Sequence, residues 1–328
     1  MTVDQHDLRR RILDRVLPVL DVLAAPIVYL AARLLRLVRR LTFERLPICA
    51  FAIDKANIYP LIDHYYEPLF NRSRLKRLSE QIRDLPEMDL NEEASLAYLA
   101  DIARPAEVRN LYPWNDDGSG GFHFDNELFG FGDAEVLHGI IRKERPRLTI
   151  EIGCGWSSRI IAQALAMNAG ELGWRGRHVC VEPHLPFDFS APGAEVVSQP
   201  VEHYDPARLL DLQRGDVVFI DSSHMIRPEG DVLYEIQELL PRLGSGVLVH
   251  FHDIFSPRDY SDRLVRRHRV FWNEQYLLEA FLVFNHEFEV ILPLNHLWHS
   301  YRDSVAKVCP RLAERPEAEP SSFWIRRK

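Results

Sequence analysis

Cysteine is scarce in this sequence and is not arranged in pairs. The 328 residues include four cysteines, and none lies in a C-x-x-C motif: Cys49, Cys154, Cys180 and Cys309. Short cysteine spacings are the usual sequence sign of a zinc site, and an even set in a small secreted chain indicates disulfides. The pattern therefore indicates neither kind of framework, and it is typical of a protein of the reducing cytoplasm.

An excess of positive charge is also lacking. Forty lysines and arginines stand against 48 aspartates and glutamates, so the formal net charge is -8. A body that binds nucleic acid is usually basic, and the composition therefore argues against nucleic acid as a partner. The apolar and charged fractions are those of an ordinary globular protein. The length suits one large domain with a sizeable extension.

Charged residues are almost absent from residues 16–32, where Asp21 stands alone. The run is as long as the shortest membrane spans, which need about 17 to 25 residues. It contains Pro18 and Pro26, and residues 34–41 continue it as an amphipathic pattern with apolar residues between arginines. Arginines lie on both sides of the run: Arg9, Arg10, Arg11, Arg15, Arg33, Arg36, Arg39 and Arg40.

Three interpretations of this segment stay open. The simplest is a pair of helices packed on the protein's own body, or on a second subunit of a homo-oligomer. The arginines also suit peripheral contact with an anionic membrane surface, which would hold a cytoplasmic protein at the inner face of the membrane. A true span is the least favoured. A secretory signal is not expected, because no small-residue cleavage site follows a clean apolar core.

The pattern changes near residue 126. Residues 1–125 are predicted to form a helical N-terminal extension, whereas residues 126–328 alternate strand-like and helical runs, as in a mostly parallel α/β sheet. The predicted strands cover residues 147–152, 178–182, 194–201, 216–221, 246–251, 288–292 and 321–326. The predicted helices cover residues 133–145, 157–168, 231–240 and 272–284. Asp133 and either Ser157 or Ser158 are the expected N-caps of the first two.

A glycine pair follows the first predicted strand and precedes a helix, in the sequence Glu151-Ile-Gly-Cys-Gly-Trp-Ser157. Glycine lets the backbone approach a ligand closely, and a helix N-terminus presents free N–H groups to it. Dinucleotide sites use such turns too, but their fingerprint has a third glycine where this chain has serine. Glu182 ends the second predicted strand, where a carboxylate can bind ribose hydroxyls. Together these features predict an adenosine-containing ligand.

Four segments occur in the order and at the spacing of the motifs of bacterial class I S-adenosylmethionine-dependent methyltransferases, which this chain resembles. They are Glu151–Ser158, Val181–Pro183, Phe219–His224 and Val249–Asp253. Two further segments, Asp63–Phe70 and Phe271–Leu278, resemble an uncharacterised bacterial branch of that family. The resemblance implies a Rossmann-like, seven-stranded, mostly parallel sheet with an antiparallel last strand. It also implies that S-adenosylmethionine is held by Glu151, Gly153, Cys154, Gly155, Trp156, Ser157, Glu182 and Asp221.

The core is also similar to enzymes of the catechol O-methyltransferase type. In those enzymes an aspartate ends the fourth strand, a lysine three residues later is the base, and an aspartate–asparagine pair follows the fifth strand. Here the corresponding residues are Asp221, His224 and the pair His252-Asp253. The resemblance implies Asp221, His252 and Asp253 as ligands of a divalent ion, and His224, Asp221 and His252 as catalytic residues. Histidine ligation would shift the preference from magnesium toward manganese, iron or zinc. His224 acting as a base without metal stays equally open.

Other side chains are weaker candidates. Strand alternation is expected to point His250 away from His252, into helix packing. Arg227 suits an acidic substrate, although a solvated loop arginine is the simpler interpretation. Residues 122–132 are aromatic and glycine-rich, which suits either a mobile lid or an anchor under the sheet. The helix after the fifth strand offers four residues to the substrate pocket or to its own core: Trp272, Glu274, Gln275 and Tyr276.

The leading hypothesis is O-methylation of a small-molecule or glycan-type metabolite. N-methylation would use the same cofactor site without the Asp221/Asp253 pair, so bound metal would distinguish the two reactions. An NAD-dependent oxidoreductase is disfavoured by the missing third glycine and by the last predicted strand, which fits a methyltransferase sheet. A non-catalytic, membrane-associated scaffold is disfavoured because burying polar residues at strand ends without a task costs stability.

Overall fold

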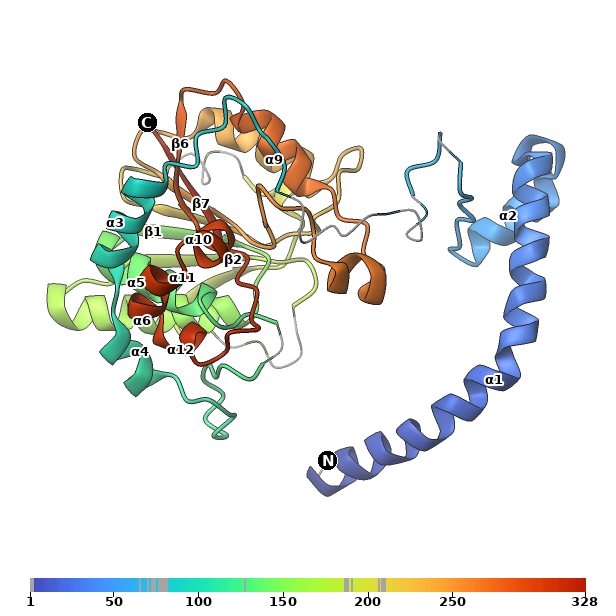
Figure 1. Cartoon of the computed structure of the whole chain (residues 1–328), viewed down its shortest axis with the longest axis horizontal. Helices are drawn as coiled ribbons and strands as arrows, with labels where there is room; N and C mark the ends of the chain where they lie inside the picture. Colours follow the sequence, from blue (N-terminus) through green and yellow to red (C-terminus); the bar gives the residue numbers. More distant parts are fainter. Residues whose placement is uncertain are drawn as a thin grey trace. The chain divides into compact units, whose positions relative to one another are not determined.

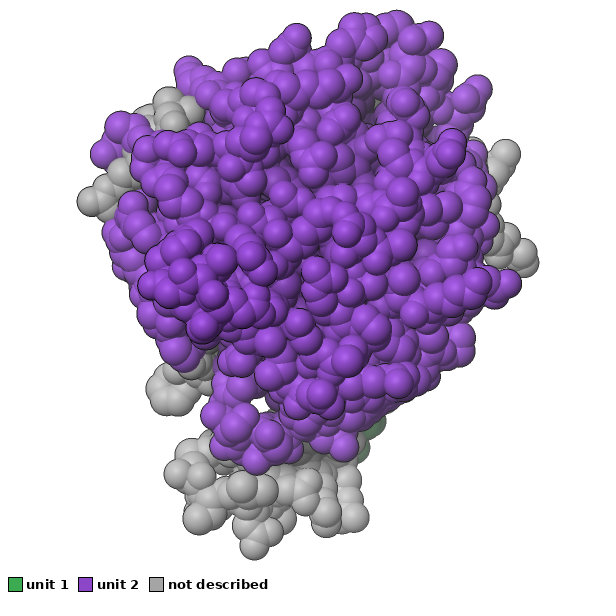
Figure 2. Space-filling model, turned by 90° about the vertical axis from the view of Figure 1, so that its left-hand side faces the viewer, with its two compact units in different colours: residues 1–75 green, residues 76–328 purple. Residues whose placement is uncertain are grey.

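Two units make up the chain in this computed structural model, residues 1–75 and residues 76–328 (Figure 2). The structure describes residues 3–64, 66–69, 71, 75, 82–126, 128–185, 189, 191–205, 207 and 211–328, with side chains from residue 16 onward. Tyr65 and Phe70, which belong to one of the segments that carry the family resemblance, lie outside the described residues. Helices between residues 92 and 111 pack within the second unit, although the sequence prediction placed them in the N-terminal extension.

The first unit begins with one continuous helix, α1 (Val3–Leu41), where the sequence suggested a pair (Figure 1). Pro18 and Pro26 both lie inside it. The short turn η1 (Phe43–Arg45) and helix α2 (Pro47–Lys55) follow. Within α1, the segment Val16–Leu41 is long and apolar enough to cross a membrane by length and composition.

The second unit is built on a seven-stranded sheet in the order β3-β2-β1-β4-β5-β7-β6. All neighbouring pairs from β3 to β5 are parallel, and β7 pairs antiparallel with both β5 and β6. The fold class predicted from the sequence is therefore confirmed. The strands are β1 (Leu148–Ile152), β2 (Arg177–Val181), β3 (Ala194–Val197), β4 (Val217–Ile220), β5 (Leu248–Phe251), β6 (Phe288–Pro293) and β7 (Phe323–Arg327).

Each sheet face carries its own apolar core, because successive strand residues point to opposite faces. In β4, Val217 and Phe219 belong to one core, while Val218 and Ile220 belong to the other. Because β4 is buried on both faces, nearly all of its residues are apolar. The expected third strand is shorter than predicted, because the chain turns after Val197 and forms the 3₁₀ turn η3 (Val201–His203).

Helices flank the sheet and connect its strands. The N-terminal part of the unit supplies α3 (Glu92–Ile102), α4 (Pro105–Leu111), α5 (Asp133–Glu144) and α6 (Trp156–Leu172). The predicted helix over 231–240 is a short α8 (Asp231–Leu233) that continues as the π-helical η4 (Tyr234–Leu239) and the 3₁₀ turn η5 (Leu240–Arg242). The rest are η6 (Arg263–His268), α9 (Glu274–Leu282), α10 (Leu294–Ser300), α11 (Arg302–Val308) and α12 (Pro310–Ala313).

The two predicted N-caps are wrong, because a glycine precedes each helix. Gly132 caps α5, and Asp133 is the first helical residue. The Asp133 carboxylate instead accepts the backbone N–H groups of Ser321 and Ser322 at 3.0 and 2.8 Å, which ties the start of β7 to α5. Gly155 caps α6, and its N–H donates to Ser158 Oγ at 3.1 Å.

Candidate active site

Polar segments follow four neighbouring parallel strands at the carboxyl edge of the sheet. They are residues 153–155 after β1, Glu182 after β2, residues 221–224 after β4 and residues 252–253 after β5. The Asp221 N–H donates to Ile152 O at 2.8 Å and the His252 N–H donates to Ile220 O at 2.9 Å, so these strand ends lie side by side. The chain reverses its direction of sheet growth between β1 and β4, which is where open α/β sheets bind ligands.

The two glycines of the turn have different tasks. Gly153 has a φ of +80°, and a Cβ there would lie 1.8 Å from the carbonyl oxygen of Asp221. Gly153 is therefore needed so that the turn can pack against the end of β4. A Cβ on Gly155 would meet no atom within 4 Å. Gly155 therefore faces open space at the N-terminus of α6, where free N–H groups favour an anionic ligand group.

Glu151 does not face this open space. Its carboxylate is fully buried, and it accepts the Ser157 hydroxyl at 2.6 Å and contacts His178 Nε2 at 2.8 Å. The contacts direct the side chain inward, between β1, β2 and α6. Any contribution of Glu151 to a molecule bound at the open side of the turn therefore acts through Ser157.

The other predicted cofactor residues lie on or beside the turn. Glu182 is partly exposed, and its Oε1 accepts the backbone N–H of His184 at 2.6 Å, which fixes the carboxylate at the end of β2. Trp156 is half-buried beneath the Arg159 guanidinium, 3.8 Å from the ring centroid, and its ring packs against His123. Cys154 is buried.

His224 is held between carboxylates from three segments. Its Nδ1 lies 2.8 Å from Glu274 Oε2, and its Nε2 lies 3.3 Å from Asp221 Oδ1 and 3.7 Å from Asp253 Oδ2. The imidazole is only 8% exposed, whereas the side chains of Asp221 and Asp253 are 31% and 23% exposed. The two aspartates therefore border solvent while the histidine is enclosed. His224 and Asp253 both have positive φ, 58° and 54°, the kind of backbone strain that clusters at functional sites.

The carboxylates control the charge of His224. Burial opposes a charged imidazole, but hydrogen bonds to Asp221 and Glu274 outweigh it and raise the pKa of His224 well above 6.5. Burial also acts against ionisation of Asp221, but the charge of His252 and the hydrogen bond from His224 lower the pKa of this carboxyl. Burial raises the pKa of Glu274. The arrangement therefore favours the protonated form of His224 beside an ionised Asp221.

From the sequence, Glu274 was only one of four candidates for the substrate pocket. In the structure its carboxylate lies at His224 Nδ1. The adjoining residues build the same support: the Trp272 ring lies 4.5 Å from the His224 ring, and Asn273 and Glu274 donate their N–H groups to His224 O. Gln275 is part of the helix core, because it is fully buried and accepts the Phe255 N–H at 2.7 Å. Trp272, Asn273 and Glu274 therefore orient the histidine.

His252 lies behind Asp253. Its Nε2 is 3.5 Å from Ser321 Oγ, which donates to Asp253 Oδ1 at 3.0 Å. Burial opposes charge on His252, but the charges of Asp221, Asp253 and Asp133 outweigh it and raise its pKa. These contacts connect the residue to the aspartate pair through Ser321.

The expectation that His250 points away from His252 is wrong. Their ring centroids are 5.5 Å apart, because residues two positions apart on a strand share a face. His250 does pack in the core, between Phe219 at 4.1 Å and Trp324 at 4.7 Å. Neither of its ring nitrogens has a hydrogen-bond partner in the described part of the chain, and burial holds its pKa well below 6.5. His250 is therefore a neutral core residue.

The aromatic segment 122–132 anchors the site. Phe122, Phe124 and Phe129 are buried, and the Phe129 ring lies 4.9 Å from that of His252. Arg227 is a solvated loop arginine, which is the simpler of its two interpretations. Its side chain is 59% exposed, and its Nη2 lies 3.8 Å from Asp231 Oδ1.

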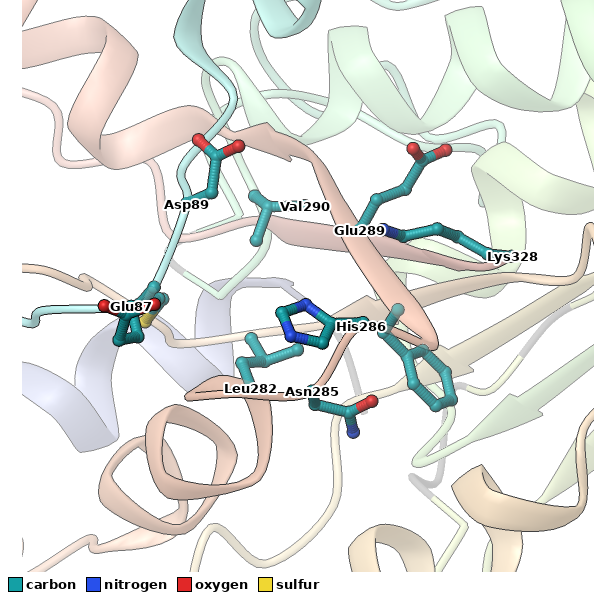
Figure 3. Close-up of a pocket in the computed structure, with 10 residues that line it drawn as sticks. Glu87, Asp89, Leu282, Asn285, His286, Glu289, Val290 and Lys328 are labelled. Atoms are coloured by element: carbon teal, nitrogen blue, oxygen red, sulfur yellow. The ribbon is translucent and has the colours of Figure 1, made fainter.

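A separate cleft of about 460 Å³ opens at the opposite edge of the sheet (Figure 3). Phe288 and Glu289 at the start of β6 line it together with His286 and Lys328. Because β6 runs parallel to β5, its first residues lie at the amino edge, away from the glycine turn. The cleft is therefore separate from the site described above.

Comparison with known proteins agrees with the geometry. Residues 150–254 match a protein family described as a methyltransferase domain. The match begins in β1 and ends after β5, so it includes the glycine turn, Glu182, Asp221, His224 and Asp253. No curated protein matches the chain. The family match and the fold support a methyltransferase domain over these residues, and the family implies S-adenosylmethionine as the methyl donor.

Proposed function

We propose that this protein is an S-adenosylmethionine-dependent methyltransferase that methylates an oxygen of a small-molecule or glycan-type metabolite. The observation that carries the proposal is the position of His224 between Asp221 and Asp253, at strand ends beside the glycine turn. Methyl transfer needs an aligned nucleophile and a group that takes its proton. The site offers both an enclosed base and an adjoining open turn.

The cofactor, when bound, supplies a methyl group activated by a sulfonium. The open space at Gly155 and the N-terminus of α6 suit its carboxylate end, since unpaired N–H groups and the helix dipole favour an anion. Glu182 suits the ribose hydroxyls, because its carboxylate is already fixed at the end of β2. Asp221 borders the same turn through its contact with Gly153.

In its neutral form, His224 accepts the proton of the acceptor hydroxyl at Nε2. Because Asp221 and Glu274 raise its pKa, the neutral form becomes more abundant as the pH rises, and the rate of methyl transfer is expected to rise with it. Glu274 holds Nδ1, which orients the ring and selects the ring nitrogen that faces the aspartates. Asp221 and Asp253 stabilise the imidazolium that forms. This division of tasks, a base oriented by one buried carboxylate, is a recurring solution in enzymes that activate hydroxyl groups.

Asp221 and Asp253 also fit a divalent ion. Both carboxylates approach the same His224 nitrogen and both border solvent, so a cation can reach them. When bound there, the ion would reduce the repulsion between the carboxylates and make a hydroxyl more acidic. Among the described residues, the predicted trio Asp221, His252 and Asp253 does not bring its ligand atoms within 4.8 Å of one another. The Nε2 of His252 contacts Ser321, so this side chain would have to move to become the third ligand. N-methylation without metal is the second candidate, and it would use His224 alone.

Chelation tests the metal. Treatment with a chelator is expected to lower the rate of methyl transfer by an order of magnitude or more, with recovery on adding back manganese or magnesium. Asp253→Ala is expected to be slow and insensitive to both treatments, because it lacks one of the two carboxylates. The measurement is transfer of a labelled methyl group to the acceptor that the wild type uses.

The matched control is Asp231→Ala, which removes a nearby carboxylate that binds Ser223 rather than facing Nε2 of His224. It should retain the response to chelator. Full activity of the wild type in chelator, with no metal in the purified protein, would exclude the ion and leave His224 as a simple base.

We also propose that α1 associates with lipid. Its large apolar side chains from Val16 to Leu34 are all exposed, with Val22, Leu23 and Ile27 at 74%, 68% and 70%. A packed helix needs one apolar stripe, whereas a helix that is apolar all round is typical of a lipid or core environment. Arg33, Arg36 and Arg40 follow this apolar stretch in the sequence and would meet anionic headgroups, whereas Arg39 pairs with Glu67.

Removing residues 1–45 is expected to abolish binding to phosphatidylglycerol vesicles and to leave binding of S-adenosylhomocysteine unchanged. In the full chain, Leu23→Glu should weaken vesicle binding, because a charge within an apolar membrane segment costs about 2.5 to 3.5 kcal/mol. Vesicle sedimentation measures the first effect and calorimetry the second. If the truncated protein keeps its lipid affinity and its oligomeric state, α1 serves neither membrane nor subunit contact.

A further inference from the structure

A second group of metal-ligating side chains lies inside the sheet, behind the glycine turn. Glu151 of β1 is in register with Cys180 of the neighbouring β2, and His178 lies two residues before Cys180 on the same face. His178 Nε2 is 2.8 Å from Glu151 Oε2, and Cys180 Sγ is 3.4 Å from each of these atoms. All three residues are buried. In the described ranges, no other trio of His, Cys, Asp or Glu brings its ligand atoms within 4.8 Å of one another.

Cys154 supplies a fourth group from the glycine turn itself. Its Sγ lies 3.7 Å from the carbonyl oxygen of Glu151, on the turn that follows β1. The four side chains therefore come from β1, the turn and β2. Ser157 donates to Glu151 Oε1 at 2.6 Å, which leaves Oε2 directed at the histidine and the thiol.

We propose that Glu151, His178 and Cys180 form a buried zinc site between β1 and β2, and that Cys154 moves inward as the fourth ligand and so fastens the glycine turn to β2. Thiolate and imidazole ligands select zinc over magnesium, and four protein ligands in a buried position are typical of a structural site. The site is distinct from the Asp221/Asp253 pair, whose oxygen ligands suit harder ions. It also stands independently of the proposed reaction, because it needs neither cofactor nor acceptor.

The spacing of the side chains is close to what zinc requires. Zinc bonds of about 2.0 to 2.3 Å in a tetrahedron put neighbouring ligand atoms about 3.3 to 3.8 Å apart. The distances from Cys180 Sγ to Glu151 Oε2 and to His178 Nε2 are both 3.4 Å, which already matches this spacing. Within the trio, only the distance from His178 Nε2 to Glu151 Oε2, at 2.8 Å, has to lengthen, by about half an ångström. Small side-chain rotations are enough for this change. Cys154 Sγ does not lie within 4.8 Å of all three ligand atoms, so its side chain has to move toward them to complete the tetrahedron.

The test loads the reduced full-length protein with cobalt in place of zinc. We expect about one ion per chain and a thiolate-to-cobalt charge-transfer band in the near ultraviolet, because a closed site has four protein ligands. Cys180→Ser should weaken the band and lower metal affinity at least about tenfold, since one ligand of the set is lost. Cys49→Ser, a cysteine in α2, is the matched control and should change neither. Asp253→Ala should also keep the band, which separates this site from the proposed active-site ion.

Metal uptake by the wild-type protein tests the zinc site even if Cys180→Ser does not fold. Reduced wild-type protein that takes up no cobalt with a thiolate band would overturn the proposal. A native disulfide between Cys154 and Cys180, detected by mass spectrometry, would overturn it as well. Binding of S-adenosylhomocysteine is measured separately, so failure of the zinc site is distinguishable from failure of the methyltransferase proposal.

Discussion

Replacing His224 by alanine is expected to lower the rate of methyl transfer by roughly 10²- to 10⁴-fold, the usual contribution of a positioned general base. The imidazole is the group whose Nε2 faces both Asp221 and Asp253, while Glu274 holds its Nδ1. Binding of S-adenosylhomocysteine should change little, because the glycine turn and Glu182 are untouched. The measurement pairs single-turnover methyl transfer with calorimetry.

Glu274→Gln provides a graded comparison. The amide can still contact Nδ1 but no longer favours the imidazolium, so an intermediate loss of rate is expected, with unchanged cofactor affinity. Arg227→Ala is the matched control, because Arg227 is exposed on the same loop. Unchanged turnover in His224→Ala would show that this histidine is not the base and would leave alignment beside the cofactor as the whole mechanism.

Replacing Gly155 by valine is expected to reduce affinity for S-adenosylhomocysteine about 100-fold or more, equivalent to roughly 2.7 kcal/mol. A Cβ at this position meets no protein atom within 4 Å, so the protein should fold normally while the added methyl groups enter the proposed cofactor space. The φ of Gly155, -171°, is extended backbone that other residues adopt. Calorimetry measures the affinity, and thermal unfolding verifies the fold.

Two other glycines serve as controls. Gly170→Ala lies within α6, also with open space at its Cβ, and should keep both stability and affinity. Gly153→Val should destabilise the protein itself, because its Cβ would clash with the Asp221 carbonyl oxygen. Tight binding of S-adenosylhomocysteine by Gly155→Val would show that the cofactor does not pass this residue. Binding of NADH instead would favour the oxidoreductase alternative.

The strands of the second unit could be predicted because apolar runs and turn residues are patterns of adjacent residues. The apolar run ending at Asp221 and the glycine turn after Ile152 follow from residues adjacent in sequence, whereas the antiparallel direction of the last strand was implied by the family resemblance. Chain order also placed Asp221, His224 and Asp253 at neighbouring strand ends, since parallel strands end at one edge. The helix caps were mispredicted because residue type alone favoured Asp133 and the serines over the glycines that precede them.

The sequence by itself determined the sheet, the turn and the polar strand ends, because periodicity and turn chemistry act over a few residues. Only the tertiary structure decided which side chains meet. It brought Glu274 to His224 across 50 positions and Ser321 to Asp253 across 68. It also turned Glu151 inward to His178, and it separated the packing task of Gly153 from the open space at Gly155. Contacts of this kind depend on how strands and helices pack, and no local pattern in the sequence records that packing.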